Sequence, residues 1–232
     1  MNIFIFHNDL RLHDNTGLHA AIKAGKTIPI FVFTPEQIGQ QNKYRSQVAI
    51  DFMCGALKHL DTELRKHGSR LHVFYGHTHS IVRQIIRQYK IAGVYCNQNY
   101  TPFSIERDKA VEKVCKSSKV SFNHLEDYLL FPIGSITTAG GVYKKFTPYF
   151  EASKKHKVAP IANYRLTNLT KVTIGNVSIK KFLKNPPLMK ENLGGFKSVP
   201  SYAKTRNTPS IDTTHLSVYI KFGCVSIREV YH

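Results

Sequence analysis

The chain has 232 residues, 42% of them hydrophobic, which is enough for one large domain or for one and a half ordinary ones. No apolar stretch approaches the length of a membrane span. The short apolar run at residues 3–6 is too brief for a signal-peptide core, since Asp9 and Arg11 soon follow it. The sequence therefore predicts a soluble, intracellular protein that enters no membrane.

The net charge of +18 is concentrated in one part of the chain. Residues 144–206 contain 14 Lys and Arg against two acids, so this stretch carries +12 of the total. A basic field of this size favours phosphate-bearing partners, because binding releases the counterions that surround the phosphates, although basic charge also serves solubility.

Cysteines and histidines give no metal-binding motif, so no metal is predicted. The cysteines form no CxxC pair, which argues against a zinc ribbon or a disulfide framework and favours reduced, mostly buried thiols. His77 and His79 flank Thr78, but no HExxH-like helical pair exists. The four cysteines are Cys54, Cys96, Cys115 and Cys224.

Strand and helix patterns alternate over the first 120 residues. Short apolar runs predict strands at 2–6, 27–33, 70–75, 91–96 and 119–122, and apolar steps of three and four predict helices at 17–24, 80–89 and 103–115. A longer helix is predicted between a Ser46 cap and Gly68. Its apolar face is predicted to contain Val48, Phe52, Ala56, Leu57, Leu60 and Leu64.

This alternation is typical of βαβ units, so the fold class is α/β, with a doubly wound five-stranded parallel sheet and helices on both faces. The α/β domain is predicted at residues 1–130. Scattered prolines and little periodicity predict a long basic connector at 131–211, with a short helix at 146–155. The connector is either wrapped over another domain or partly disordered. A helical pattern resumes at 212–232.

Three common nucleotide or catalytic signatures are missing. No GxGxxG follows the first strand, and no GxxxxGK[ST] or GxSxG occurs, which disfavours a Rossmann dehydrogenase, a P-loop NTPase and an α/β-hydrolase. The loop at residues 7–15 carries both charge signs beside a helix start. Asp14 or Asn15 can cap that helix, and Asp9 can pair with Arg11. A fixed turn that docks another domain is favoured there over a direct catalytic role.

Hydroxyl groups gather near the end of the chain, in the segment Asp212-Thr213-Thr214-His215-Leu216-Ser217. The free N–H groups and the positive dipole end of a helix starting there can bind a phosphate. The alternative is a plain Thr or Ser cap.

Four segments in order resemble the DNA photolyase/cryptochrome family. Residues 7–15 resemble its opening F-R-x-D-L-R-L-x-D-N, and Asn97 to Tyr100 with Arg107-Asp108 resembles its N-x-x-Y…R-D segment. Residues 143–150 resemble its Y-x-x-F-T-P-F/Y-F/W element. Residues 213–229 resemble T-S-x-L-S-P-Y-L…G-x-x-S-P-R-E.

The resemblance implies an α/β domain, which in this family often binds an antenna chromophore, followed by an all-helical FAD-binding domain. In photolyases, excited reduced FAD passes an electron to a pyrimidine dimer in damaged DNA, which then splits. By position, Arg206 matches an arginine that often contacts DNA. The residues matching FAD contacts are Tyr202, Thr213, Thr214, Leu216 and Ser217.

The sequence also departs from the family pattern. About half the expected length is absent, with most flavin contacts, and the chain has no tryptophan for an electron relay. His7 and Asn8 stand where an arginine is usual, Val218 replaces a proline, and Asp212 replaces a glycine. The segment after Tyr100 lacks the Asn-Glu pair of some folate-binding members, which leaves a deazaflavin antenna or none.

Three functional hypotheses follow. The chain is a DNA photolyase, a fragment of a longer or split gene that is inactive by itself, with a second chain as one source of the missing half. It is alternatively a cryptochrome-like blue-light photoreceptor without repair activity, or a non-catalytic remnant. The basic connector favours DNA as the partner, and the catalytic residues are expected outside this sequence.

Overall fold

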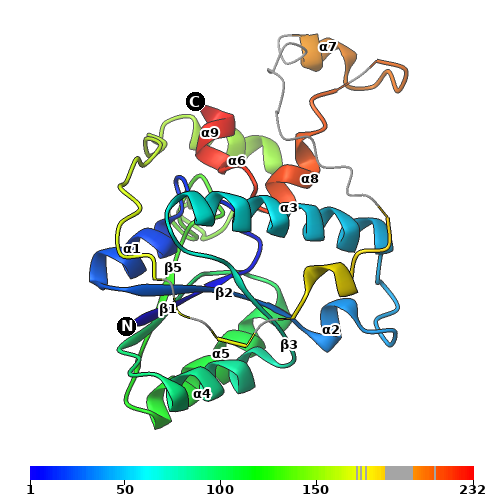
Figure 1. Ribbon diagram of the computed structural model, residues 1–232. Helices are drawn as coiled ribbons and strands as arrows, with labels where there is room; N and C mark the ends of the chain where they lie inside the picture. The colour runs from blue at the N-terminus through cyan, green and yellow to red at the C-terminus, as the bar shows by residue number, and fades with distance from the viewer. Residues whose placement is uncertain (171, 173, 176, 186–200, 212) are drawn as a thin grey trace.

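A computed structural model describes residues 1–170, 172, 174–175, 177–185, 201–211 and 213–232. Its centre is one parallel sheet in the order β3-β2-β1-β4-β5 (Figure 1). In register, Ile5 of β1 lies between Ile30 of β2 and Cys96 of β4. The strands are β1 (Asn2–Phe6), β2 (Thr27–Phe33), β3 (His72–Tyr75), β4 (Gly93–Asn97) and β5 (Ser121–Leu125).

Helices cover both faces of this sheet. One core cluster joins α1 (Thr16–Ala24) and α3 (Gln47–Lys66) to one face, and the second joins α4 (Thr78–Gln88) and α5 (Pro102–Ser117) to the other. The strands β1 and β2 are buried along their whole length, which explains their almost continuous apolar sequence. The predicted doubly wound five-stranded parallel sheet is therefore confirmed.

Local signals set most helix ends. The Asn15 side chain caps α1 by accepting from the Leu18 N–H, and Ser46 caps α3 by accepting from the Ala49 N–H. Gly68 adopts φ +71° just after α3, as expected of the glycine that ends a helix. One expectation was wrong: Val48 is 66% exposed because the buried part of α3 starts at Ile50. Just after β2, Pro35 begins the short helix α2 (Pro35–Ile38).

The connector is packed onto the α/β unit in its described parts. Its described part contains α6 (Phe146–Ser153) and, later, the short 3-10 helix η1 (Ile179–Lys181). The Thr27 N–H donates to the Asn168 carbonyl at 2.7 Å, and the Val177 N–H donates to the Val73 carbonyl at 2.7 Å. The ring of Phe182 packs against Phe33 with ring centres 4.3 Å apart. The described part of the connector therefore packs against the α/β unit that precedes it in the sequence.

In the part of the chain that the structure describes, three short helices follow: α7 (Tyr202–Thr205), α8 (Leu216–Lys221) and α9 (Ile227–Tyr231). Tyr219 and Phe222 contact Phe52 of α3, with ring centres 5.2 and 5.3 Å apart, so α8 is anchored on the α/β unit (Figure 1). Among the described residues, no helix has the length and apolar character needed to span a bilayer.

Leu57 and Val48 of α3 differ sharply in burial, which predicts different effects on stability when each is truncated. Leu57→Ala removes a completely buried side chain, so we expect the free energy of unfolding to fall by about 2–5 kcal/mol. Val48→Ala on the same helix is the control and should change it by less than about 0.5 kcal/mol. Urea unfolding followed by circular dichroism measures both, and equal effects would contradict the burial described here.

Candidate functional site

The loop after β1 lies at the point where the strand order of the sheet reverses, between β1 and β4. Asn97, the last residue of β4, is completely buried. Its Nδ2 donates to Asp9 Oδ2 at 2.6 Å and to Asn15 Oδ1 at 2.8 Å, and its Oδ1 accepts from the Gly17 N–H at 2.8 Å. Doubly wound sheets bind their ligands at such a point. Here the side chains of Asn97, Asp9 and Asn15 lie there and hydrogen-bond to one another.

Asp9 does not pair with Arg11, so that expectation was wrong. Asp9 Oδ1 accepts from the His7 N–H at 2.6 Å and its Oδ2 from Asn97, which uses both oxygens. Complete burial raises the pKa of Asp9 to about 6. Arg11 turns away and its Nη2 donates to Asp127 Oδ2 at 2.6 Å.

Two buried carboxylates and two arginines form the centre of the arrangement. Arg228 of α9 donates through Nε to Asp14 Oδ2 at 2.7 Å and through Nη2 to Asp127 Oδ1 at 3.0 Å. Burial by itself raises the pKa of Asp127, but the Arg11 charge and hydrogen bonds from Thr16 outweigh it and hold that pKa below its usual value. The two arginines thus keep two buried negative charges paired.

The start of α9 is fitted to the same loop. Ser226 and Glu229 form a capping box, and the Ser226 hydroxyl also donates to Asp14 Oδ2. Glu229 Oε2 lies 2.9 Å from His13 Nε2. Gly223 has φ +63°, and a Cβ there would collide with the backbone of Asn8. The loop at residues 7–15 therefore docks the segment at residues 223–229, which confirms the docking role predicted for it.

The predicted phosphate-binding residues lie around the start of α8. Thr213, Thr214 and Ser217 are exposed, while Leu216 is only 8% exposed and can offer a ligand only its backbone. Thr214 Oγ1 accepts from the Leu216 N–H at 3.4 Å, but the N-cap residue of α8 is His215 and no side-chain capping bond forms, so the plain Thr or Ser cap that was the alternative is not seen. The helix does begin within the Thr-Thr-His-Leu-Ser stretch, as expected, and Asp212 lies outside the described residues.

The other two predicted residues lie on a separate element. Tyr202 begins α7 and is 51% exposed, and Arg206, just after that helix, is also exposed. Figure 1 shows α7 farther from the sheet than α8. The structure therefore groups three hydroxyls at α8 and sets Tyr202 and Arg206 apart from the α/β unit.

A cavity of about 300 Å³ lies between the loop after β1, the C-terminal half of α3 and the connector. None of the predicted FAD or DNA contacts lines it. Its lining includes Arg11 and Cys224 of the docking interface and three histidines, His13, His59 and His67.

The residues that sequence reasoning missed are Asn97, Asp127, Ser226 and Arg228. A capping-box signature, Ser followed three residues later by Glu, marks the start of α9 and was available. Nothing local indicates that Asp127 accepts from both Arg11 and Arg228, because these partners are 116 and 101 residues away.

The paired charges predict a large cost for removing one of them. Arg228→Gln leaves two buried carboxylates with one arginine, so we expect unfolding to become easier by about 3–5 kcal/mol. Arg165→Gln, at an exposed arginine of the connector, should change stability by less than about 0.5 kcal/mol. Hydrogen exchange should become faster in α9 of the first variant, and unchanged exchange would refute the docking role.

The raised pKa of Asp9 predicts a pH dependence with a definite sign. Between its ordinary value of 3.8 and about 6, the folded protein holds a proton on Asp9 that the unfolded chain has released. The stability of the wild type relative to Asp9→Asn should therefore fall as pH rises through this window. Unfolding of both proteins at each pH measures the difference, and a difference that rises with pH would contradict the assignment.

The chain is similar to known proteins over almost its whole length. The model of the DNA photolyase family, described as "DNA photolyase", matches residues 2–165. Over 99% of this chain, the deoxyribodipyrimidine photo-lyase of Synechococcus sp. is 26% identical and cryptochrome-1 of Anopheles gambiae is 26% identical. The match covers 52% and 51% of those proteins, so the chain spans about half the length of the curated relatives it matches.

A solved structure agrees with this result. The photolyase from the archaeon Sulfolobus tokodaii, described with two FAD molecules, superposes with a TM-score of 0.81 and 34% identity. That similarity covers 100% of this chain and 54% of the archaeal one. Because the family model spans most of the chain and the fold agrees throughout, this protein belongs to the DNA photolyase family.

Proposed function

We propose that this chain is the α/β domain and first flavin-binding segment of a protein for light-driven DNA repair. In that reaction, reduced FAD donates an electron to a pyrimidine dimer. Family membership supports this class of reaction. The observation that supports DNA as the partner is the exposed basic surface of the connector. The proposed division is an α/β domain at 1–130, a connector at 131–211 and the start of a helical domain at 212–232.

The basic surface is available to DNA. Every Lys and Arg of residues 144–206 that the structure describes is exposed. Exposed ammonium and guanidinium groups can approach phosphates without the cost of leaving a buried partner. We place Arg206 among the DNA contacts. The exposed positions are Lys144, Lys145, Lys154, Lys155, Lys157, Arg165, Lys180, Lys181, Lys184, Lys204 and Arg206.

The residues at α8 fit the phosphate part of FAD. The exposed hydroxyls of Thr213, Thr214 and Ser217 can donate to phosphate oxygens, and Tyr202 offers an exposed ring. When bound, reduced FAD supplies the electron for dimer cleavage. Nothing among the described residues at α8 encloses a flavin ring, and tight binding needs most of the ligand buried. We therefore propose that this chain alone repairs no DNA and needs further helical residues, for example from a second chain.

DNA binding is testable through salt dependence. We expect the full chain to bind duplex DNA with an affinity that falls steeply as salt rises, because phosphate contacts release counterions. A variant with four connector lysines changed to glutamine should bind about tenfold more weakly and show a shallower slope. The changes are Lys144→Gln, Lys145→Gln, Lys155→Gln and Lys157→Gln.

The matched control removes the same charge from the α/β unit. It carries Lys58→Gln, Lys90→Gln, Lys113→Gln and Lys116→Gln, all at exposed positions. Fluorescence anisotropy measures both variants, and an equal loss of affinity would show that only net charge matters. Adding a dimer to the DNA separates lesion recognition from general binding.

Flavin binding is testable on the same protein. We expect weak FAD binding that the double variant Thr214→Val and Ser217→Ala reduces by about tenfold, since each hydroxyl lost removes a hydrogen bond to charged phosphate. Thr208→Val, at an exposed hydroxyl after α7, is the control. Flavin fluorescence anisotropy is the measurement, and equal binding by both variants would contradict the placement.

A cryptochrome-like photoreceptor is the second candidate, favoured by the equal identity and coverage of the Anopheles protein. Light-dependent dimer splitting by the completed protein would exclude it. An antenna chromophore also belongs to the proposal. The archaeal relative carries two FAD molecules, so a second flavin joins a deazaflavin among the candidates.

A further inference from the structure

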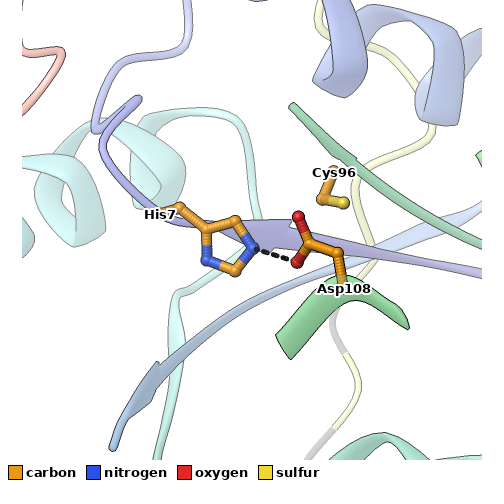
Figure 2. Close-up of side chains that lie close together, drawn as sticks. All are labelled: His7, Cys96 and Asp108. Carbon is orange, nitrogen blue, oxygen red and sulfur yellow. Dashed lines mark ion pairs between the residues drawn. The ribbon is translucent and has the colours of Figure 1, made fainter. Parts of the chain in front are cut away.

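Three side chains with metal-binding atoms meet between the sheet and α5, outside the residues discussed for flavin and DNA. They are His7, just after β1, Cys96 of β4 and Asp108 of α5 (Figure 2). Their ligand atoms all lie within 4.8 Å of one another, and His7 Nε2 is 4.0 Å from Asp108 Oδ1. The pairing of β1 with β4 and the packing of α5 create this meeting.

The cluster is buried and one of its atoms is unsatisfied. Cys96 is 1% exposed, Asp108 is 4% exposed, and the side chain of His7 is 10% exposed. His7 Nε2 is inaccessible to solvent and has no hydrogen-bond partner. A buried nitrogen without a partner costs free energy, and a bound cation would remove that cost.

We propose that His7, Cys96 and Asp108 together bind one zinc ion. A nitrogen, a sulfur and a carboxylate oxygen form a ligand set typical of zinc, which accepts all three types in a tetrahedral site. Binding forms the zinc–sulfur bond and releases the thiol proton of Cys96 to solvent. The fourth position goes to water or to His124, whose Nε2 lies 3.1 Å from Asp108 Oδ2.

The neighbouring charges are compatible with a cation. Arg107 Nε donates at 2.7 Å to Asp108 Oδ1, the oxygen that lies 4.0 Å from His7 Nε2, and this oxygen keeps a second lone pair for the metal. In that role Arg107 fixes the carboxylate from outside, as such outer hydrogen bonds do in many metal sites. The Cys96 thiolate and the Asp108 carboxylate bring two negative charges to Zn²⁺, and with the Arg107 guanidinium the cluster has a net charge of one positive.

The site depends on a residue that departs from the family pattern. An arginine is usual in the family pattern where His7 and Asn8 stand, and an arginine has no lone pair for a metal. An arginine at position 7 would instead reach Asp108 as an ion pair. With histidine at position 7, the arginine–Asp108 ion pair is lost and a metal ligand is gained. The zinc ion, instead of that ion pair, would then link β1, β4 and α5.

The test uses the full chain freed of metal with a chelator, with cobalt(II) as the spectroscopic probe. We expect one cobalt per chain, with the visible bands of a tetrahedral site and a thiolate-to-cobalt charge-transfer band in the near ultraviolet. Zinc should displace the cobalt, and magnesium should not. A folded wild-type chain without the thiolate band at stoichiometric cobalt would overturn the proposal.

Three variants identify the ligands. Cys96→Ser should abolish the charge-transfer band, whereas Cys54→Ser, at a buried thiol in the other core cluster, should retain it. His7→Arg should weaken zinc binding by about tenfold or more, while its own ion pair with Asp108 keeps the chain folded. A band that survives Cys96→Ser, or zinc binding unchanged by His7→Arg, refutes the site.

Discussion

Two buried carboxylates, Asp14 and Asp127, are the constraint on which the arrangement of the chain depends. Carboxylates without partners cannot remain charged in such a place, and Arg11 and Arg228 supply the compensating charge. Arg228 comes from the far end of the sequence, 214 residues from Asp14. The negative charges of Asp14 and Asp127 are therefore fully paired only when α9, which carries Arg228, is docked against the loop after β1.

Docking of α9 fixes what surrounds it. The turn through Gly223 passes so close to Asn8 that a side chain has no room, and α8 places Tyr219 and Phe222 on α3. The hydroxyls proposed to bind flavin phosphates consequently lie on, or just before, a helix anchored to the α/β unit. A flavin held there would keep a defined position relative to the α/β unit.

The distribution of charge matches the proposed division of labour. Acids and bases are paired and buried where the loop meets α9, whereas the connector exposes its lysines and arginines. Buried pairs fix geometry, and exposed cations attract phosphates over a distance. The cluster at His7 belongs to the buried class, and its chemistry is independent of both flavin and DNA.

The sequence alone determined the sheet, the helices on each face and the beginning of α8, because buried parallel strands and caps leave local signals such as the run at β1 and Ser46 before α3. It could not determine that Arg11 pairs with Asp127 instead of Asp9, since Asn97 and the His7 N–H already occupy Asp9. Nor could it place His7 beside Cys96 and Asp108. Only the tertiary structure decided these contacts, because strand order and competition for hydrogen bonds choose among partners that lie many residues apart.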